Sequence, residues 1–120
     1  MINPGSLDFS NQVVKKPSAS KRITVTNTGE KPLYINSVVL SGEQASDFTL
    51  KNDTCTGANV ATQKSCVIDV VFAPAAVGSR KAELVITDNA VDSPQKVMLT
   101  GIGINSVRVP PDGSSNSGSF

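Results

Sequence analysis

The stretch Ser65-Cys66-Val67-Ile68-Asp69-Val70-Val71-Phe72-Ala73-Pro74 determines the fold class that the sequence predicts. Successive side chains of a β-strand point to opposite faces, and in this stretch every second residue is apolar. Pro74 ends the run because proline has no N–H to donate to a neighbouring strand. Val71 belongs to the outer face, where we expect it to be exposed or to lie under a peripheral loop. We predict a central strand with the inward side chains Cys66, Ile68, Val70 and Phe72.

Shorter segments with the same period of two occupy the chain as far as Gly103. Turn-forming residues such as Thr28-Gly29-Glu30-Lys31-Pro32 recur about every 8–12 residues, which is typical of an all-β sandwich or barrel. No helical period of 3.6 residues is sustained. Leu7 and Phe9 alternate with Asp8 in a short first strand. Besides the central strand, the predicted inward residues are Ile23, Val25, Phe48, Leu50, Ala82, Leu84, Ile86, Val97 and Leu99.

The segment from Leu33 to Leu40 contains a change of parity. Leu33 and Ile35 share one face of a strand, whereas Val38 and Leu40 have the opposite parity. We expect either a β-bulge at 36–37 or a strand that crosses from one sheet to the other at this point.

Composition and charge exclude several classes of function. The 120 residues suit one domain, and the net charge of +1 provides no field for holding nucleic acid or an anionic membrane. We expect neither nucleic-acid binding nor membrane insertion, because no apolar run approaches the roughly 20 residues of a membrane helix. Met1 is followed by Asn3-Pro4-Gly5 without a basic and apolar leader, so we expect a mature or excised module.

Two cysteines, Cys55 and Cys66, lie eleven positions apart. They are compatible with two buried thiols or a reactive pair, but a zinc site is poorly supplied with ligands in a chain without histidine. We favour a disulfide, because residues 56–59 and 62–65 have the composition of a loop that turns back onto the central strand. Closing such a loop contributes about 3 kcal/mol in the chain-entropy description and indicates an oxidising compartment.

The sequence contains no convincing catalytic or cofactor site. The absence of histidine excludes Ser–His and Cys–His arrangements, and the carboxylates are scattered over different predicted strands and loops. Asp88, Asn89 and Asp92 share one loop and are weak calcium candidates, although Asp and Asn are also ordinary turn residues. We expect no catalytic residues, no cofactor and no metal.

The composition changes after residue 104. Residues 105–120 are rich in Pro, Gly and Ser and lack the apolar surface that ordering a chain requires. We therefore expect a sandwich domain over residues 1–104 and a flexible tail or linker over 105–120.

Several stretches resemble the hydin-type immunoglobulin-like domains, especially the bacterial form called the choice-of-anchor D repeat. The resemblance runs from Pro4 to Gly103, with Asn27-Thr28-Gly29, Phe72-Ala73-Pro74 and Leu99-Thr100-Gly101-Ile102-Gly103 among its tightest matches. It implies a seven-stranded immunoglobulin-like β-sandwich, similar to major sperm protein and to the N-terminal domain of pilus chaperones of the PapD type. It transfers no catalytic residues.

From this resemblance we expect a non-catalytic structural or protein-interaction module of a bacterial cell-surface or secreted protein. The expected location is extracellular, at the cell surface or periplasmic, and the expected partners are neighbouring domains or surface and filament proteins. One alternative is a carbohydrate- or ligand-binding accessory domain. Another is an intracellular cytoskeletal or ciliary adaptor of the major sperm protein type, against which a proven disulfide would count.

Overall fold

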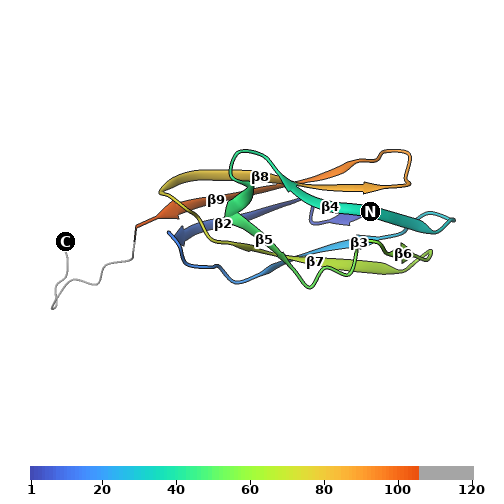
Figure 1. Cartoon of the computed structure of the whole chain (residues 1–120). Coiled ribbons are helices and arrows are strands. Elements are labelled where there is room, and N and C mark those ends of the chain that lie inside the picture. The colour runs from blue at the N-terminus through green and yellow to red at the C-terminus, as the bar shows by residue number, and fades with distance from the viewer. Residues whose placement is uncertain (106–120) are drawn as a thin grey trace.

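The computed structural model describes residues 1–105, which form two β-sheets packed face to face (Figure 1). One sheet has four strands in the order β1-β3-β7-β5, and the other has five in the order β2-β9-β8-β4-β6. No helix in this part of the chain has the length and apolar character needed to cross a membrane. The elements are β1 (Ile2–Asn3), β2 (Ser6–Val13), β3 (Lys21–Thr26), β4 (Leu33–Ser41), the 3₁₀ helix η1 (Ala45–Asp47), β5 (Phe48–Lys51), β6 (Asn59–Val60), β7 (Ser65–Phe72), β8 (Gly78–Asp88) and β9 (Gln95–Ile104).

The predicted fold class is confirmed, but the predicted number of strands is wrong. Residues 1–105 contain nine strands rather than seven. The two additional strands, β1 and β6, have two residues each, too few for an alternating pattern to show in the sequence. Residues 45–47 form η1 directly before β5 starts. Beyond Asn105, the predicted tail lies outside the described residues.

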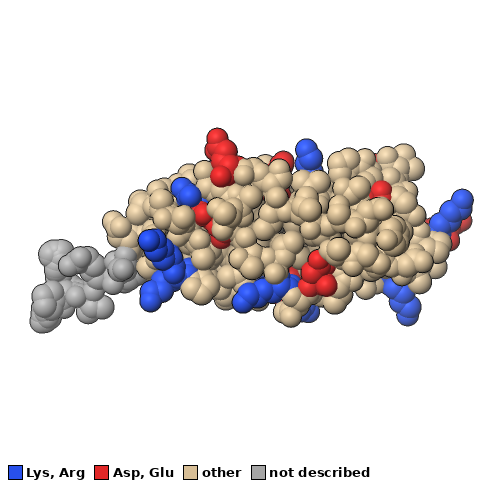
Figure 2. Space-filling model, in the orientation of Figure 1, with Lys and Arg blue, Asp and Glu red and all other residues tan. Residues whose placement is uncertain are grey.

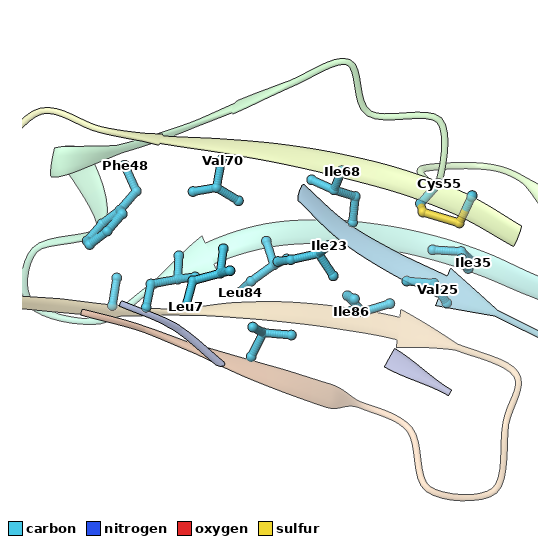
Figure 3. Close-up of a cluster of buried hydrophobic side chains, with 14 of the residues drawn as sticks. Leu7, Ile23, Val25, Ile35, Phe48, Cys55, Ile68, Val70, Leu84 and Ile86 are labelled. Atoms are coloured by element: carbon cyan, nitrogen blue, oxygen red, sulfur yellow. A yellow bond between two sulfur atoms is a disulfide. The ribbon is translucent and has the colours of Figure 1, made fainter. Parts of the chain in front are cut away.

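Strand β7 is central in the four-stranded sheet, as predicted. It pairs with β3 in the register Ile23↔Ile68 and with β5 in the register Phe48↔Phe72. Its four predicted inward side chains are buried, and Ile68 and Val70 point toward Leu84 and Ile86 of the opposite sheet (Figure 3).

Val71 is buried, with only 8% of its surface exposed, so of its two expected placements, exposed or under a peripheral loop, the exposed one is wrong. It still faces away from the main core cluster, as its parity requires. Thr49 of β5 pairs with it on one side. On the other side the segment before β3 runs alongside, because the Ser18 N–H donates to the Phe72 carbonyl oxygen over 2.8 Å. Flanking chain on both sides of β7 therefore accounts for its burial.

Three phenylalanines from three strands join the two sheets. The ring centroid of Phe72 on β7 lies 4.9 Å from that of Phe48 on β5 and 5.6 Å from that of Phe9 on β2. Tilted and offset rings at such distances attract each other in addition to the free energy of their burial. This cluster fixes one end of the core.

The predicted irregularity in β4 is a β-bulge. The ladder between β4 and β8 shifts register between Ile35 and Ser37, and β4 remains in one sheet, so the bulge rather than the crossing is correct. The pairing of β2 with β9 also shifts register, between Asp8 and Asn11. The bulge in β4 brings Val38 and Leu40 back to the inner face, where they pack half-buried against the core.

The N-terminal segment changes sheets between β1 and β2. β1 pairs antiparallel with β3, whereas β2 pairs parallel with β9. The parallel pairing joins segments more than ninety positions apart in the sequence and has no local signal. This pairing makes β2 the edge strand on one side of the five-stranded sheet.

Candidate interaction surface

The structure joins Cys55 and Cys66 in a disulfide with an S–S distance of 2.06 Å. Both cysteines are buried, and the bond ties the loop after β5 to the start of β7. Asp53 shapes that loop, because its Oδ1 accepts hydrogen bonds from the N–H groups of Cys55 and Thr56 over 2.8 and 3.0 Å. The bond pins a segment that has little regular structure of its own to the central strand.

The turn after β8 uses the calcium candidates Asp88 and Asn89 as hydrogen-bonding groups. Buried Asp88 accepts from the Gln95 side chain over 2.6 Å, and its Oδ1 accepts from a main-chain N–H within the turn. Asn89 Oδ1 accepts from the Tyr34 N–H over 2.9 Å, while Asp92 is exposed. Within residues 1–105 no group of three or more His, Cys, Asp or Glu side chains is placed to hold a metal ion. The geometry therefore gives Asp88 and Asn89 a role in shaping the turn.

Asn27 organises the neighbouring turn. Its Nδ2 donates to the carbonyl oxygens of Lys31 and Val60 over 2.7 and 2.9 Å, and its Oδ1 accepts from the Gly29 N–H over 2.9 Å. Its main-chain N–H and C=O bond to the chain around Gln63 and Lys64. The side chain is buried with both donors and its acceptor satisfied, which explains the Asn-Thr-Gly motif in structural terms.

An ion pair lies on the outer face of the four-stranded sheet. Asp69 of β7 is buried to 5% exposure, and its carboxylate accepts from Arg22 Nε over 2.8 Å and from Asn52 Nδ2 over 2.9 Å. The pKa of Asp69 is lowered to about 2, with the hydrogen bond from Arg22 as the largest cause and the hydrogen bond from Asn52 as the second. The sequence placed both Arg22 and Asp69 outward, but their pairing depends on the register of β3 against β7, which the alternation does not show.

A second ion pair, more deeply buried than the first, joins η1 to β8. Asp47 is 2% exposed, and its Oδ2 lies 2.7 Å from Nε of Arg80. The Asp47 carbonyl oxygen also accepts from the Ala73 N–H over 2.8 Å. The sequence predicts a solvated or turn-capping role for Asp47, and its burial in this ion pair contradicts the solvated role. The pair fixes the chain where it passes from one sheet to the other.

The outer face of the five-stranded sheet carries exposed apolar side chains. Val39 on β4 and Met98 and Ile102 on β9 are each nearly half exposed, and Val39 pairs with half-buried Val85. Charged side chains of both signs are scattered over the face drawn in Figure 2, without a patch of a single sign. Such a surface favours contact with a protein over contact with a polyanion.

The side of the sandwich formed by β4 and β5 is partly uncovered. Within residues 1–105, β5 pairs with β7 alone, and β6 pairs with β4 at just two positions, Leu33 and Tyr34. Hydrogen bonds to residues 57 and 58 extend that cover to Ile35. From 36 to 41, no strand within residues 1–105 pairs with β4 on the side away from β8. Unpaired edges of this kind are templates for an added strand.

The described arrangement is shared with known families and structures. Residues 2–102 match the family described as HYDIN/CFA65/VesB-like, Ig-like domain. A search of curated proteins finds no match. Among solved structures, the ASH/PapD-like domain 7 of human CEP192 is similar, with a TM-score of 0.64, 11% identity, and coverage of 89% of this chain and 86% of that chain.

Two further structures extend the comparison. The secreted serine protease VesC from Vibrio cholerae gives a TM-score of 0.62 at 17% identity, covering 84% of this chain and only 22% of VesC. SSP-19, an MSP-domain protein like family member in Caenorhabditis elegans, gives 0.59 at 13% identity, covering 84% of this chain and 97% of SSP-19. At such identities these likenesses concern the fold alone, and they confirm the expected similarity of fold to PapD-like and major sperm protein domains. By its match over residues 2–102, the chain belongs to the HYDIN/CFA65/VesB-like family of immunoglobulin-like domains.

Proposed function

We propose that this chain is a non-catalytic protein-interaction module of a bacterial cell-surface or secreted protein, and that it docks to other polypeptides through its open strand edges. The observation that carries the proposal is the uncovered side of β4 and β5. Main-chain N–H and C=O groups at a free edge offer hydrogen bonds to any extended segment, and exposed Val39 beside them offers apolar contact.

The disulfide supports the proposed location. Both sulfur-bearing residues are buried, and such bonds persist in extracellular and periplasmic compartments. VesC, whose structure is similar, is described as secreted. The same bond counts against an intracellular adaptor role.

For the carbohydrate-binding alternative, the candidate site is the hollow between the turns after β3 and β8. Asn27, Lys31, Asn89 and Val91 are among its lining residues, and none of the lining residues is aromatic. An aromatic face is the usual platform for a ring-shaped ligand with an apolar side. We therefore rank this alternative below docking of a polypeptide.

Amide-resolved NMR of the ¹⁵N-labelled full chain distinguishes the two. One titration uses a synthetic extended peptide of alternating Val and Thr, and the other uses soluble peptidoglycan fragments. The peptide should shift amide signals of 36–41 or of β5, and the fragments should shift none. Shifts confined to 28–32 and 89–92 with the fragments would support the carbohydrate alternative and contradict the proposed function.

A further inference from the structure

The pairing of β4 with β8 determines which main-chain N–H and C=O groups of β4 point to its free edge. The Gln44 N–H donates to the Lys81 carbonyl oxygen over 3.1 Å, so the main-chain groups of Lys81 point toward the β4 side of β8. The main-chain N–H and C=O groups of successive residues in a strand point to alternate sides. Val85 lies four residues after Lys81, so its groups also point toward β4, where its partner is Val39. The N–H and C=O groups of Val38 and Leu40 therefore point away from β8, to the uncovered side.

This edge lacks the features that protect the other edges of the sandwich. β1 and β6 are two residues long, β5 has four residues and contains Lys51, and β2 contains Asp8 and a bulge. In contrast, 36–41 reads Asn-Ser-Val-Val-Leu-Ser, without a charge or a proline. Short length, charge, proline and bulges are the usual means of preventing edge pairing. The bulge in β4 precedes this segment, at 35–37.

The segment is also self-complementary. In an antiparallel pairing of two identical copies centred on Val39, Ser37 meets Ser41 of the other copy, Val38 meets Leu40, and Val39 meets Val39. Polar residues face polar residues and apolar residues face apolar residues, with no like charges opposed. The centre would be a non-hydrogen-bonded pair, flanked by hydrogen-bonded pairs made by the outward-pointing groups of Val38 and Leu40.

We propose that the occupant of this edge is a second copy of the same chain, joined by two-fold antiparallel pairing of β4 with β4 over 37–41. Val38 and Leu40 pack against the core at this side but stay half-buried. The pairing would cover the exposed part of both side chains. This inference rests on the proposed function and names its partner. A five-residue contact buries little area, so the association is weak and depends on concentration.

Sedimentation velocity of the full chain, from about 10 µM to about 1 mM, tests the association. The weight-average sedimentation coefficient should rise with concentration toward that of a dimer. Val39→Lys opposes two ammonium groups at the two-fold axis and should weaken the dimer by at least about tenfold. The matched control is Ile102→Lys, because Ile102 is 46% exposed and Val39 is 49% exposed on the same sheet face, but only Val39 lies on the edge. The control should dimerise like the native chain.

Cross-linking provides a second readout. Val39→Cys should form an intermolecular disulfide on mild oxidation, and Ile102→Cys at equal concentration should not. A native chain that stays monomeric to about 1 mM, or loss of the dimer with Ile102→Lys but not with Val39→Lys, would overturn the inference. If the dimer is not found, peptide-induced shifts at the same edge would still support the proposed function. Failure of the dimer inference is therefore distinguishable from failure of the proposed function.

Discussion

The ring of Phe72 occupies the space that a side chain at Gly101 would need. A Cβ built on Gly101 of β9 would overlap three ring carbons of Phe72, which reaches across from the opposite sheet. The two residues therefore set the distance between the sheets at this end of the core. This close approach explains a glycine in the middle of a paired strand, where glycine otherwise weakens the strand.

Gly101→Ala should lower the free energy of unfolding by about 1–3 kcal/mol, the usual cost of overpacking a core. The control is Gly5→Ala, since a Cβ at Gly5 meets no atom within 4 Å. Urea denaturation of both variants provides the comparison. Equal losses in the two variants would show that the Phe72 ring does not fill this space.

Phe72→Ala should cost about 3–5 kcal/mol, because it empties a fully buried site in the aromatic cluster. Val71→Thr places a hydroxyl in a buried position outside the main core and should cost about 1–2 kcal/mol. Chemical denaturation ranks the two. A larger loss for Val71→Thr would mean that the inward and outward faces of β7 are exchanged.

The pKa of Asp69 should be about 2 in the folded chain, measured from its carboxyl ¹³C shift against pH. Because this pKa lies below the ordinary value of about 3.9, the group stabilises the fold above about pH 4. This stabilisation is lost as the pH falls from about 4 toward 2. Arg22→Met removes the largest cause and should raise the pKa of Asp69, whereas Lys21→Met should leave it in place. An unchanged pKa in Arg22→Met would contradict the assigned cause.

The disulfide should be intact in natively purified protein. Alkylation before reduction should add no label, and alkylation after reduction should label both Cys55 and Cys66. Reduction should lower the free energy of unfolding by about 3 kcal/mol, since the bond closes a short loop. Two thiols that react without reduction would contradict both the bond and the proposed extracellular location.

The alternation of apolar and polar residues predicted the features that depend on a single strand. The alternation in β7 predicted the burial of Ile68, Val70 and Phe72, and the parity change near Ser37 indicated a bulge or a crossing between sheets, of which the bulge is found. The sequence did not show what depends on pairing between distant strands. The Arg22–Asp69 ion pair follows from the register of two strands more than forty residues apart.

Surface features were missed for a related reason. The uncovered edge of β4 depends on where β6 stops pairing, and the pattern of one strand contains no information about its neighbours. The burial of Val71 likewise depends on the chain that flanks β7 on both sides. The absence of charge in 36–41 was visible in the sequence and acquires its meaning only once this segment is known to be an edge.

Amide hydrogen exchange along β4 tests the central claim, an open edge available for docking, most directly. In dilute full-length protein, the Val39 N–H, which pairs with Val85 of β8, should exchange slowly. The N–H groups of Val38 and Leu40 should exchange much faster, because they point to the uncovered side. Slow exchange at all three positions under dilute conditions would show that the edge is already covered, and would contradict the account.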